Sequence, residues 1–475
     1  MSMATQALDE PNPRRWLALA LLCLANFMVI MDTSIIGVAL PAIQQALGYA
    51  QENLQWVFNA YVIFFGGMLL LGGRLSDLFG QRLIFIAGFA ILTAASLLAG
   101  LAWNEASLNI GRAVQGIGSA LIAPSAMTMV MLLFGGRPKE LGKALGFWGA
   151  SAAAGGTAGV FLGGVITEWL SWQWTFLINL PVGALALAVS PVLLAKGSRR
   201  PGKVDFAGAI FITGALVIAV YGIVTAEDAG WGSLHTWASL GIAALLLLVF
   251  LLIQLNSKDP LVPMRIWAVP NLAAGNLALA LLAGGWIPLW FFLNLYLQQV
   301  LKLTAFEGGA ALLPMTVLLM VFMTAVTGKL IAKFGLKANI TVGLAALAGS
   351  LFLFSGHTPA DGNFLANVLP AGLLGALGMS LAYIPATMAS MSGARPEETG
   401  LASGLANTSY QIGSAISLAA VSAVAASVTA RSADSAVTAL NAGFHQAFFW
   451  AGWVAVAGAA AAFIFIRGSR ASRKL

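Results

Sequence analysis

Charged residues are scarce in this sequence of 475 residues. Aspartate, glutamate, lysine and arginine make up only 9% of it, whereas hydrophobic residues make up 59%. Soluble domains carry about 25% charged residues. The low charge therefore excludes a chain that meets water on all sides.

Residues that hold disulfides, metals or nucleotides are equally sparse. Cys23 is the single cysteine, which excludes an intramolecular disulfide framework and a cysteine-rich metal site. His235, His357 and His445 are far apart in the sequence and match no zinc or haem-attachment spacing. The phosphate-binding pattern Gly-x-x-x-x-Gly-Lys-Ser/Thr is missing. We therefore expect no metal, no cofactor and no use of ATP.

Long apolar runs fill most of the chain. Runs of roughly 20 apolar residues recur from end to end, as in transmembrane helices, and the short alternating segments of a β-barrel are not visible. The first run is too long for a signal-peptide core and no small-residue cleavage site follows it. The sequence therefore predicts an all-α integral membrane protein with a retained first helix.

Membrane topology explains the net charge of +7 better than nucleic-acid binding does. The lysines and arginines fall in alternate loops or in the two tails, except for Lys302, Arg431 and Arg112. Loops rich in lysine and arginine stay in the cytoplasm. We therefore expect both termini in the cytoplasm, an even number of crossings and no nucleic-acid partner.

The apolar runs predict fourteen transmembrane helices. Their expected ranges are 16–40, 53–72, 83–102, 107–134, 141–166, 175–195, 206–225, 237–254, 272–301, 308–332, 338–355, 364–391, 400–429 and 444–467. The first of these is expected to end at Pro41.

A repeated polar segment divides these helices into two halves. Segment 73–82 (GRLSDLFGQR) follows the second helix, and segment 328–337 (GKLIAKFGLK) follows the tenth. Each predicts a tight turn at a membrane surface, because glycine permits a sharp reversal. Two six-helix halves alone would put the second copy after the eighth helix. We therefore predict six plus two plus six helices, with an N-terminal bundle at 14–195, a linker with two extra helices at 196–255 and a C-terminal bundle at 270–467.

Five motifs follow one another along the chain. They are 31–41 (MDTSIIGVALP), the segment 73–82, 111–118 (GRAVQGIG), 155–164 (GGTAGVFLGG) and 172–183 (WQWTFLINLPVG). Taken in order they resemble the major facilitator superfamily, specifically its fourteen-helix drug/proton antiporters. The chain departs from that pattern at Gly37, Val160 and Gln173, where the branch usually has asparagine, proline and arginine.

Asp32 and Arg112 are the first candidates for function. A carboxylate inside a membrane helix is costly and usually functional, and burial disfavours its charged form, so Asp32 could take up a proton. Both residues are expected in the outer half of the bundle, with Gln115 one helical turn from Arg112. The resemblance implies proton coupling by these three residues. The alternatives are a fixed structural ion pair and a helix-capping or loop role for Asp32.

Asp77 is the candidate for gating. At the cytoplasmic end of the second helix it can meet helix N-termini or nearby arginines. The resemblance implies a charge contact that stabilises one end of the transport cycle, made by Gly73, Arg74, Asp77, Gly80 and Arg82. Ala332 stands where Asp77 would recur, so any such contact is one-sided. A solvated loop carboxylate is the alternative.

The glycines of the antiporter-like motif are Gly155, Gly159, Gly163 and Gly164. Three of them recur every fourth residue and line one helix face, which lets another helix come very close. We expect either a tight contact that rocks during transport or ordinary small-residue packing.

The substrate site is expected between the halves near the midplane. Aromatic and amide side chains suit flat or cationic lipophiles, although each of them singly also suits packing or interface anchoring. The candidates are Asn26, Phe27, Trp56, Asn59, Tyr61, Trp286, Trp290, Asn294, Tyr296, Gln298, Tyr383, Asn407, Tyr410 and Gln411.

These features predict a monomeric proton-coupled antiporter of the bacterial inner membrane, in contact with membrane lipids, that exports lipophilic drugs by alternating access. Neutral or monocationic substrates and few protons per cycle are expected, because Asp32 is the one centrally placed acid of the sequence. The alternatives are a narrow exporter of one endogenous metabolite, antibiotic or lipid, an uptake symporter, and a membrane enzyme or receptor. The last needs a catalytic cluster or a sensing domain, and the sequence offers neither.

Overall fold

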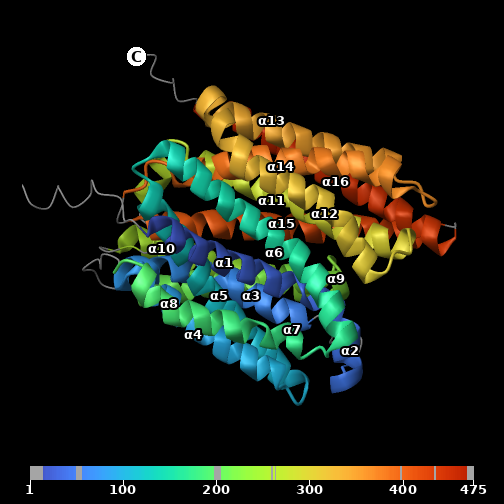
Figure 1. The fold of residues 1–475 in the computed structure, drawn as a ribbon, viewed down its shortest axis with the longest axis horizontal. Coiled ribbons are helices and arrows are strands. Elements are labelled where there is room, and N and C mark those ends of the chain that lie inside the picture. Colours follow the sequence, from blue (N-terminus) through green and yellow to red (C-terminus); the bar gives the residue numbers. More distant parts are fainter. Residues whose placement is uncertain are drawn as a thin grey trace, which may run out of the picture.

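The computed structural model describes residues 14–49, 56–196, 205–257, 260, 262, 264–395, 398–432 and 435–467. All regular structure in this part of the chain is helical, and the helices run nearly parallel to one long axis (Figure 1). The helices of the first half are α1 (Arg15–Ser34), α2 (Ile36–Leu47), α3 (Trp56–Phe79), α4 (Gln81–Gly100), α5 (Glu105–Phe134), α6 (Pro138–Trp169), α7 (Trp174–Leu177) and α8 (Asn179–Leu193).

Two further helices, α9 (Phe206–Ala229) and α10 (Leu234–Asn256), connect the halves. The second half comprises η3 (Met264–Ala268), α11 (Leu272–Leu295), η4 (Tyr296–Val300), α12 (Ala305–Val321), η5 (Phe322–Val326), α13 (Thr327–His357), η6 (Phe364–Val368), α14 (Leu369–Met391), α15 (Thr399–Arg431) and α16 (Ala436–Phe465). The two halves form two bundles side by side (Figure 1).

Twelve helical stretches of the described residues are long and apolar enough to cross a membrane. One of them, Phe306–His357, runs through α12, η5 and α13 and contains a break at Gly335. The apolar stretch Ile210–Ile223 within α9 is shorter than the twelve. The chain is therefore a multi-pass, all-helical membrane protein.

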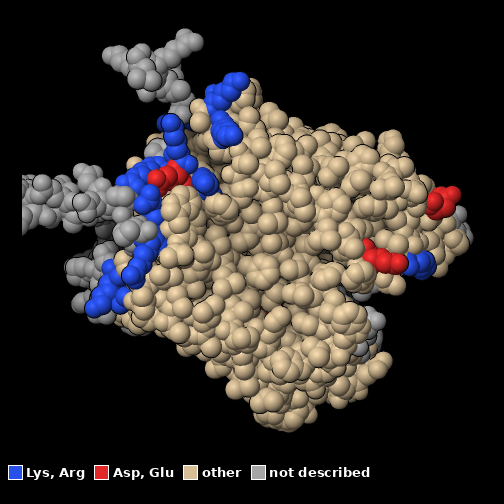
Figure 2. Space-filling view, viewed as in Figure 1, with Lys and Arg blue, Asp and Glu red and all other residues tan. Residues whose placement is uncertain are grey.

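The surface agrees with this reading. Lysine and arginine side chains gather at one end of the molecule, which we call the basic end, while the broad middle is almost free of charge (Figure 2). Large apolar side chains are exposed along the middle of the outer helices, for example Leu245 at 59% and Leu248 at 53% in α10. Such a belt matches the hydrocarbon core of a membrane.

Local sequence explains several helix ends. Asn104 and Ser107 form a capping box at α5, and Thr304 and Glu307 form another at α12. Each satisfies backbone amides that the first helical turn leaves without a partner.

The predicted end of the first helix at Pro41 is wrong. The chain breaks between α1 and α2 at Ile35 and then stays helical through Pro41 to Leu47. The hydroxyls of Thr33 and Ser34 both bond back to the carbonyl of Ile30, at 2.7 and 2.8 Å. Such bonds compete with the helical pattern and bend it, so the break comes earlier than the proline suggested.

The predicted start of the last helix is wrong by eight residues. Helix α16 begins at Ala436, where Ser435 accepts a hydrogen bond from the amide of Thr438. The mixed segment 436–443 is helical although its sequence is less apolar than the run that follows it.

The repeated segments form shorter turns than the sequence predicted. Helix α3 continues to Phe79, and the reversal falls on Gly80, which has φ 94°. Gly335, its counterpart in the second copy, has φ 78°. Glycine adopts this left-handed conformation without strain, so the two equivalent glycines, rather than the whole polar segments, make the turns.

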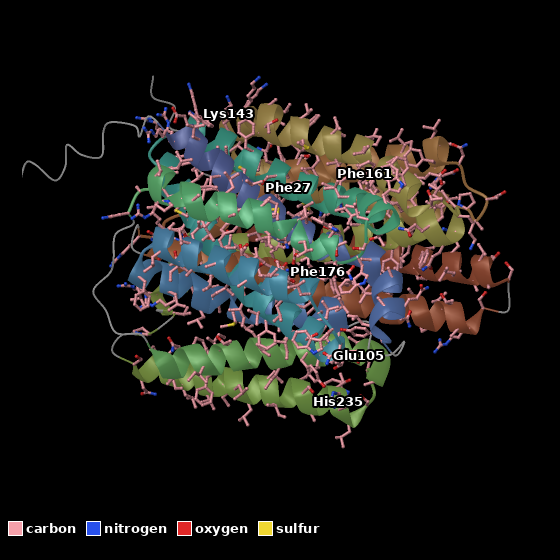
Figure 3. The ribbon with its side chains drawn as sticks, turned by 60° about the horizontal axis from the view of Figure 1, so that its bottom comes forward. Phe27, Glu105, Lys143, Phe161, Phe176 and His235 are labelled. Carbon is pink, nitrogen blue, oxygen red and sulfur yellow. The ribbon has the colours of Figure 1, made fainter. Side chains whose placement is uncertain are left out.

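The pair α9–α10 lies along one side of the molecule, where α9 packs against α3 (Figure 3). A Cβ atom at Gly67 of α3 would come within 3.2 Å of the backbone nitrogen of Val217 in α9. Farther from the basic end, Trp56 of α3 stacks on Tyr221 of α9 with ring centroids 5.7 Å apart. The absence of a side chain at Gly67 thus lets the two backbones approach closely.

Candidate functional site

A buried ion pair lies inside the first bundle. The Nη1 atom of Arg112 in α5 is 2.7 Å from Oδ2 of Asp32 in the last turn of α1. The two side chains are 0% and 1% exposed. A buried charge of this kind persists when a partner and hydrogen bonds compensate it.

Amide and hydroxyl groups complete the cluster around this pair. Asn179 Nδ2 donates to Asp32 Oδ1 at 2.7 Å, and Gln115 Nε2 lies 3.4 Å from the same oxygen. Gln115 Oε1 accepts from Arg112 Nη1 at 2.9 Å. Ser96 Oγ accepts from Gln115 at 2.8 Å and from Asn179 at 3.1 Å. Helices α1, α4, α5 and α8 therefore contribute to one polar network, which we call the Asp32 cluster.

The remaining contacts of Arg112 fix its side chain. Its Nε donates to the carbonyl of Val57 at 2.8 Å. The guanidinium lies over the ring of Tyr61, 4.5 Å from the centroid, and 5.9 Å from that of Phe176. A cation over an aromatic face is attracted to it, more so when water is excluded.

Apolar side chains cover the cluster on the side away from the basic end. Ile35, Val57 and Phe176 belong to a buried layer contributed by α2, α3 and α7 and their neighbours. Tyr49 anchors this layer, because its hydroxyl donates to the carbonyl of Glu105 at 3.0 Å. Burial raises the pKa of the Tyr49 hydroxyl above its ordinary range, so this donor stays protonated at physiological pH.

The glycines of the antiporter-like motif lie beside the Asp32 cluster. A Cβ atom at Gly155 would lie 2.5 Å from the carbonyl oxygen of Phe27, and one at Gly159 would lie 2.9 Å from that of Met31. Both carbonyls belong to α1, in the same half. Gly163 is buried on α6, and a Cβ atom at Gly164 would meet nothing within 4 Å. Gly155 and Gly159 thus set how closely α6 approaches the helix that carries Asp32.

Asp77 lies where the two halves meet at the basic end. Its two carboxylate oxygens accept from the backbone amides of Gly400 and Leu401, each at 2.9 Å, in the first turn of α15. A carboxylate at a helix N-terminus is favoured by the helix dipole. Gly73 lies one helical turn away, and a Cβ atom there would be 2.5 Å from the carbonyl oxygen of Gly400. We call this contact of α3 with α15 the first seam.

The other residues of this motif have separate partners. Arg82 Nη1 donates to the carbonyls of Pro191 and Leu194 at the end of α8, each at 3.2 Å. Cations are favoured at that end of a helix. Arg74 is buried in α3, and Gly80 makes the turn.

A second seam joins α6 to α12, η5 and α13. A Cβ atom at Gly142 would lie 3.6 Å from Cα of Gly328, and the hydroxyls of Thr157 and Thr316 are in contact. Farther from the basic end, Phe161 (Figure 3) packs against Phe306, with ring centroids 5.2 Å apart. Gly328 begins the second copy of the repeated segment, so each copy places its first glycine in a contact between the halves.

A second repeat was not identified from the sequence. Residues 137–146 (RPKELGKALG) and 395–404 (RPEETGLASG) share the pattern Arg-Pro-x-Glu-x-Gly-x-Ala-x-Gly. Glu140 pairs with Arg15 at 3.1 Å, and Glu398 pairs with Arg265 at 2.6 Å. Each ion pair joins a helix of one seam to the segment that begins the same half. Self-comparison of the sequence would have detected this pattern.

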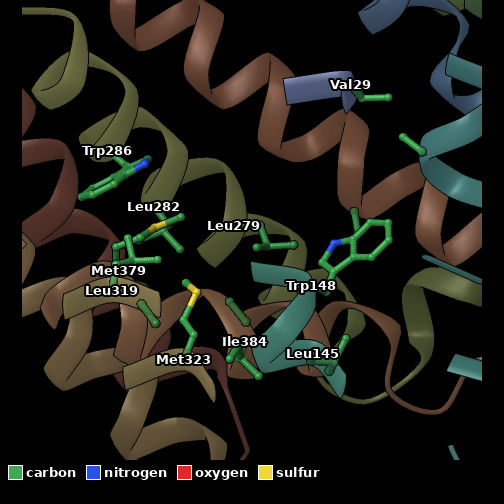
Figure 4. Close-up of a cluster of buried hydrophobic side chains, with 14 of the residues drawn as sticks. Val29, Leu145, Trp148, Leu279, Leu282, Trp286, Leu319, Met323, Met379 and Ile384 are labelled. Atoms are coloured by element: carbon green, nitrogen blue, oxygen red, sulfur yellow. The ribbon is translucent and has the colours of Figure 1, made fainter. Parts of the chain in front are cut away.

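The structure brings together some of the residues predicted for substrate binding. Tyr383 and Tyr410 are in edge contact, with centroids 6.0 Å apart, and Trp286 contacts Trp290 at 5.8 Å. Asn26 donates to the carbonyl of Trp148 at 3.0 Å. Trp148 itself, a residue that sequence reasoning missed, packs between the halves beside Leu145, Leu279 and Ile384 (Figure 4).

Others lie elsewhere. Trp56 packs on α9, Asn294 pairs with Gln298 at 2.7 Å, and Tyr296 donates to the carbonyl of Pro359 at 2.7 Å. Tyr61 belongs to the Asp32 cluster. The remaining candidates lie on α1 and α15, namely Phe27, Asn407 and Gln411, and the side chain of Asn59 falls outside the described part.

No group of three or more histidine, cysteine, aspartate or glutamate side chains suited to a metal ion occurs among the described residues.

Comparison with known proteins gives concordant matches. Residues 22–418 match the family model described as Major Facilitator Superfamily. The cephamycin export protein CmcT of Amycolatopsis lactamdurans is 38% identical over 419 residues, which cover 87% of this chain and 86% of that protein. The puromycin resistance protein pur8 of Streptomyces alboniger is 34% identical over 89% of this chain and 84% of its own.

A third relative and a solved structure extend this picture. The tetracenomycin C resistance and export protein of Streptomyces glaucescens is 32% identical over 90% of this chain and 80% of its own. The crystal structure of the human organic anion transporter MFSD10 (TETRAN) superposes with a TM-score of 0.64 at 15% identity, covering 94% of this chain and all of that one. The last likeness concerns the fold alone.

Proposed function

Because the chain belongs to the major facilitator superfamily and to its drug-efflux transporters, we propose that it exports lipophilic neutral or monocationic compounds in exchange for protons. The observation that carries this proposal is the Asp32–Arg112 pair, fully buried within a membrane helix bundle. An intramembrane ionisable residue is costly, and such residues mark substrate, ion and proton pathways.

The proposed architecture has fourteen crossings arranged as six, two and six. The kinked stretch Phe306–His357 counts as two crossings, and α9 counts as one. The two bundles comprise residues 14–195 and 270–467, with the extra pair in the linker 196–255. The basic end supports an orientation with both termini in the cytoplasm of a bacterial inner membrane.

In the proposed cycle the two halves rock about a central cavity. Protonation of Asp32 from outside releases the substrate, and deprotonation toward the cytoplasm favours loading. Arg112 cannot lose its charge in practice, so it holds Asp32 ionised until a proton arrives. The contact of Asp77 with α15 supports a role in closing the basic end, and Gly73 and Gly328 keep the seams close.

The proposed substrate site is formed where the halves part, with Trp148 and the aromatic pair Tyr383–Tyr410 as its lining. Aromatic faces and amides suit flat lipophiles of zero or one positive charge. The buried carboxylates of the described residues are Asp32, Asp77 and Glu398. Asp77 is bound to the start of α15 and Glu398 to Arg265, so a rigid dication lacks a second counter-charge near the midplane. Robust export of such a dication would contradict this part of the proposal.

A second candidate is a narrow exporter of one antibiotic or metabolite. The observation that favours it is the naming of two relatives as export proteins for single compounds, cephamycin and tetracenomycin C. It uses the same proton-coupled machinery and differs only in the breadth of the substrate site.

The test is substrate-driven proton movement in proteoliposomes. A pH gradient is imposed, lipophilic monocations and neutral drugs are added together with cephamycin and puromycin, and a dye reports internal pH. Proton flux that appears with substrate and vanishes in Asp32→Asn is expected. Unchanged flux in a folded Asp32→Asn would make the ion pair structural. Flux with one antibiotic alone would favour the narrow exporter.

A further inference from the structure

The side chains around Asp32 present only hydrogen-bond donors to it. Arg112 Nη1 faces Oδ2 at 2.7 Å, and Asn179 Nδ2 faces Oδ1 at 2.7 Å, with Gln115 Nε2 at 3.4 Å from Oδ1. An ionised carboxylate is an acceptor only, so this arrangement fits the charged form. The protonated form has an O–H group that needs an acceptor, and Asp32 is 1% exposed.

Two neighbours are unable to supply that acceptor. Arginine has donors only. Gln115 has an acceptor, but its Oε1 already accepts from Arg112 Nη1 at 2.9 Å, so turning its amide would break that bond. A buried donor without a partner costs the full desolvation of the group.

Asn179 has an acceptor to spare. Its side chain is buried, 2% exposed, and its Oδ1 atom has no hydrogen-bond partner. It begins α8, directly after the short helix α7. Its amide therefore presents a donor to Asp32 on one side and an unused acceptor on the other.

We propose that Asn179 is a two-way hydrogen-bond switch for Asp32, donating Nδ2–H to the carboxylate and reversing its amide to accept from the carboxylic acid. This rests on the proposed function, in which Asp32 carries the proton. The last torsion of asparagine is broad and roughly two-fold, so reversal leaves its other atoms in place. No covalent bond changes, and the proton stays on Asp32.

Ser96 suits both orientations. Its hydroxyl oxygen accepts from Asn179 Nδ2 at 3.1 Å in the charged state. After reversal, the Ser96 hydroxyl hydrogen can rotate and donate to the amide oxygen, because a hydroxyl is both donor and acceptor. Arg112 of α5 and Tyr61 of α3 are the charged and titratable side chains that face the cluster, whereas α6 presents Gly155 and Gly159. Arg112 and the two glycines offer no acceptor side chain, and the hydroxyl of Tyr61 is directed at the carbonyl of Val29, 3.3 Å away.

The first part of the test compares two variants of the reconstituted full-length protein. Asn179→Ser retains a group that donates and accepts, and Asn179→Leu retains the approximate size of asparagine without polar atoms. The switch predicts at least half of the wild-type proton exchange for the serine variant and a loss of tenfold or more for the leucine variant. If leucine works as well as serine, Asn179 only fills space and the switch is overturned.

The second part separates a switch from a fixed donor. Infrared difference spectra between acid and alkaline pH are expected to contain a carboxylic-acid band that is absent in Asp32→Asn. They are also expected to contain an asparagine amide band that is absent in Asn179→Ser and retained in the control Asn256→Ser, whose side chain is exposed at the end of α10. A carboxylic-acid band without the amide band would overturn the switch.

The two proposals fail differently. Proton exchange that persists in Asp32→Asn would overturn the proton-carrier role of Asp32. Even then, the presence of both infrared bands in the wild type would support the switch. The bands report protonation of Asp32 and the accompanying change of the Asn179 amide directly, without transport. Neither band in wild type would overturn it.

Discussion

Helix α6 approaches α1 closely because Gly155 and Gly159 carry a hydrogen atom in place of a side chain. A methyl group at Gly159 would lie 2.7 Å from Ser34 Oγ and 2.9 Å from the carbonyl oxygen of Met31. These atoms flank Asp32 along α1. A side chain on this face of α6 would therefore displace the helix that carries the ion pair.

Gly159→Ala is expected to destabilise the protein by about 1–3 kcal/mol through overpacking, and to reduce transport as α1 shifts. Thermal unfolding in detergent and transport in proteoliposomes measure the two effects. Gly164→Ala is the matched control, because a methyl group there meets nothing within 4 Å. Equal behaviour of the two variants would show that the close approach is unimportant.

Among the helices, α15 is held at its start by a residue of the opposite half. The Asp77 carboxylate accepts from two amides of its first turn. Beside it, Arg265 reaches the N-cap residue Glu398 from the segment before α11. The first seam thus combines a charge with a helix dipole, whereas the second seam has Ala332 at the corresponding sequence position.

Asp77→Asn is expected to open the first seam more often. Asparagine has one acceptor oxygen in place of two, so one of the two bonds to the first turn of α15 is lost and the other is weakened. The loss is about 1–3 kcal/mol, which is at least roughly five-fold in population. In a Cys23→Ser background, a cysteine at Ser403, which is fully buried beside Pro124, should then react several-fold faster with a water-soluble maleimide. Asp361→Asn, at the far end of the molecule, should leave the rate unchanged. A constant rate in Asp77→Asn would argue against closure by this contact.

The linker pair α9–α10 is joined to the second half through one buried glutamine. Gln254 Nε2 donates to Asp205 Oδ2 at 2.7 Å, and Gln254 Oε1 accepts from the amide of Val262 at 3.0 Å. Asp205 also caps α9. One side chain therefore links the start of α9, the end of α10 and the segment that leads to α11.

Gln254→Leu is expected to lower the free energy of unfolding by about 1–3 kcal/mol, because it leaves a buried amide and a carboxylate oxygen without this partner. Thermal unfolding of the purified protein tests the loss. Asn256→Leu, two residues along and exposed, should change stability by less than about 0.5 kcal/mol. Similar losses of stability in both variants would show that the buried contacts of Gln254 contribute little to the free energy of unfolding.

At the scale of the whole molecule, both seams lie at equivalent positions of the two repeats. Gly73 of the first copy meets Gly400 and Gly404, and Gly328 of the second meets Gly142. A transporter that rocks must part at least one of these seams at the basic end in each cycle. The charged contact and the linker pair are both on the α3 side, so the two seams differ in chemistry although they share a pattern.

A tether across the second seam is expected to stop transport reversibly. Cysteines at positions 142 and 328, in the Cys23→Ser background, lie within disulfide range, since a Cβ atom at Gly142 is 3.6 Å from Cα of Gly328. Oxidation should abolish transport and reduction should restore it. A matched pair within the second half, Gly285→Cys with Ala455→Cys, has Cβ atoms 3.3 Å apart and should cross-link without blocking transport. Full transport by the oxidised 142–328 pair would mean that this seam stays closed and acts as the hinge.

The sequence predicted a large part of the fold. Apolar runs located the helices because each must satisfy its backbone inside the membrane. The repeated segment predicted the duplication, and the two turn glycines are equivalent in the structure. The bend at Ile35 and the length of α3 were missed, since hydroxyl-to-backbone bonds and helix continuation past a polar segment have no signature in hydropathy.

The sequence by itself determined that the chain is a helical membrane transporter of this superfamily and that Asp32 and Arg112 are its unusual intramembrane charges, because charge in hydrocarbon is costly enough to stand out in composition. Only the tertiary structure decided their partners. Asn179 and Ser96 reach Asp32 from α8 and α4, and Gly155 and Gly159 face α1. Asparagine, glutamine, serine and glycine are common in membrane helices, so their spacing along one helix does not predict which neighbouring helix they face.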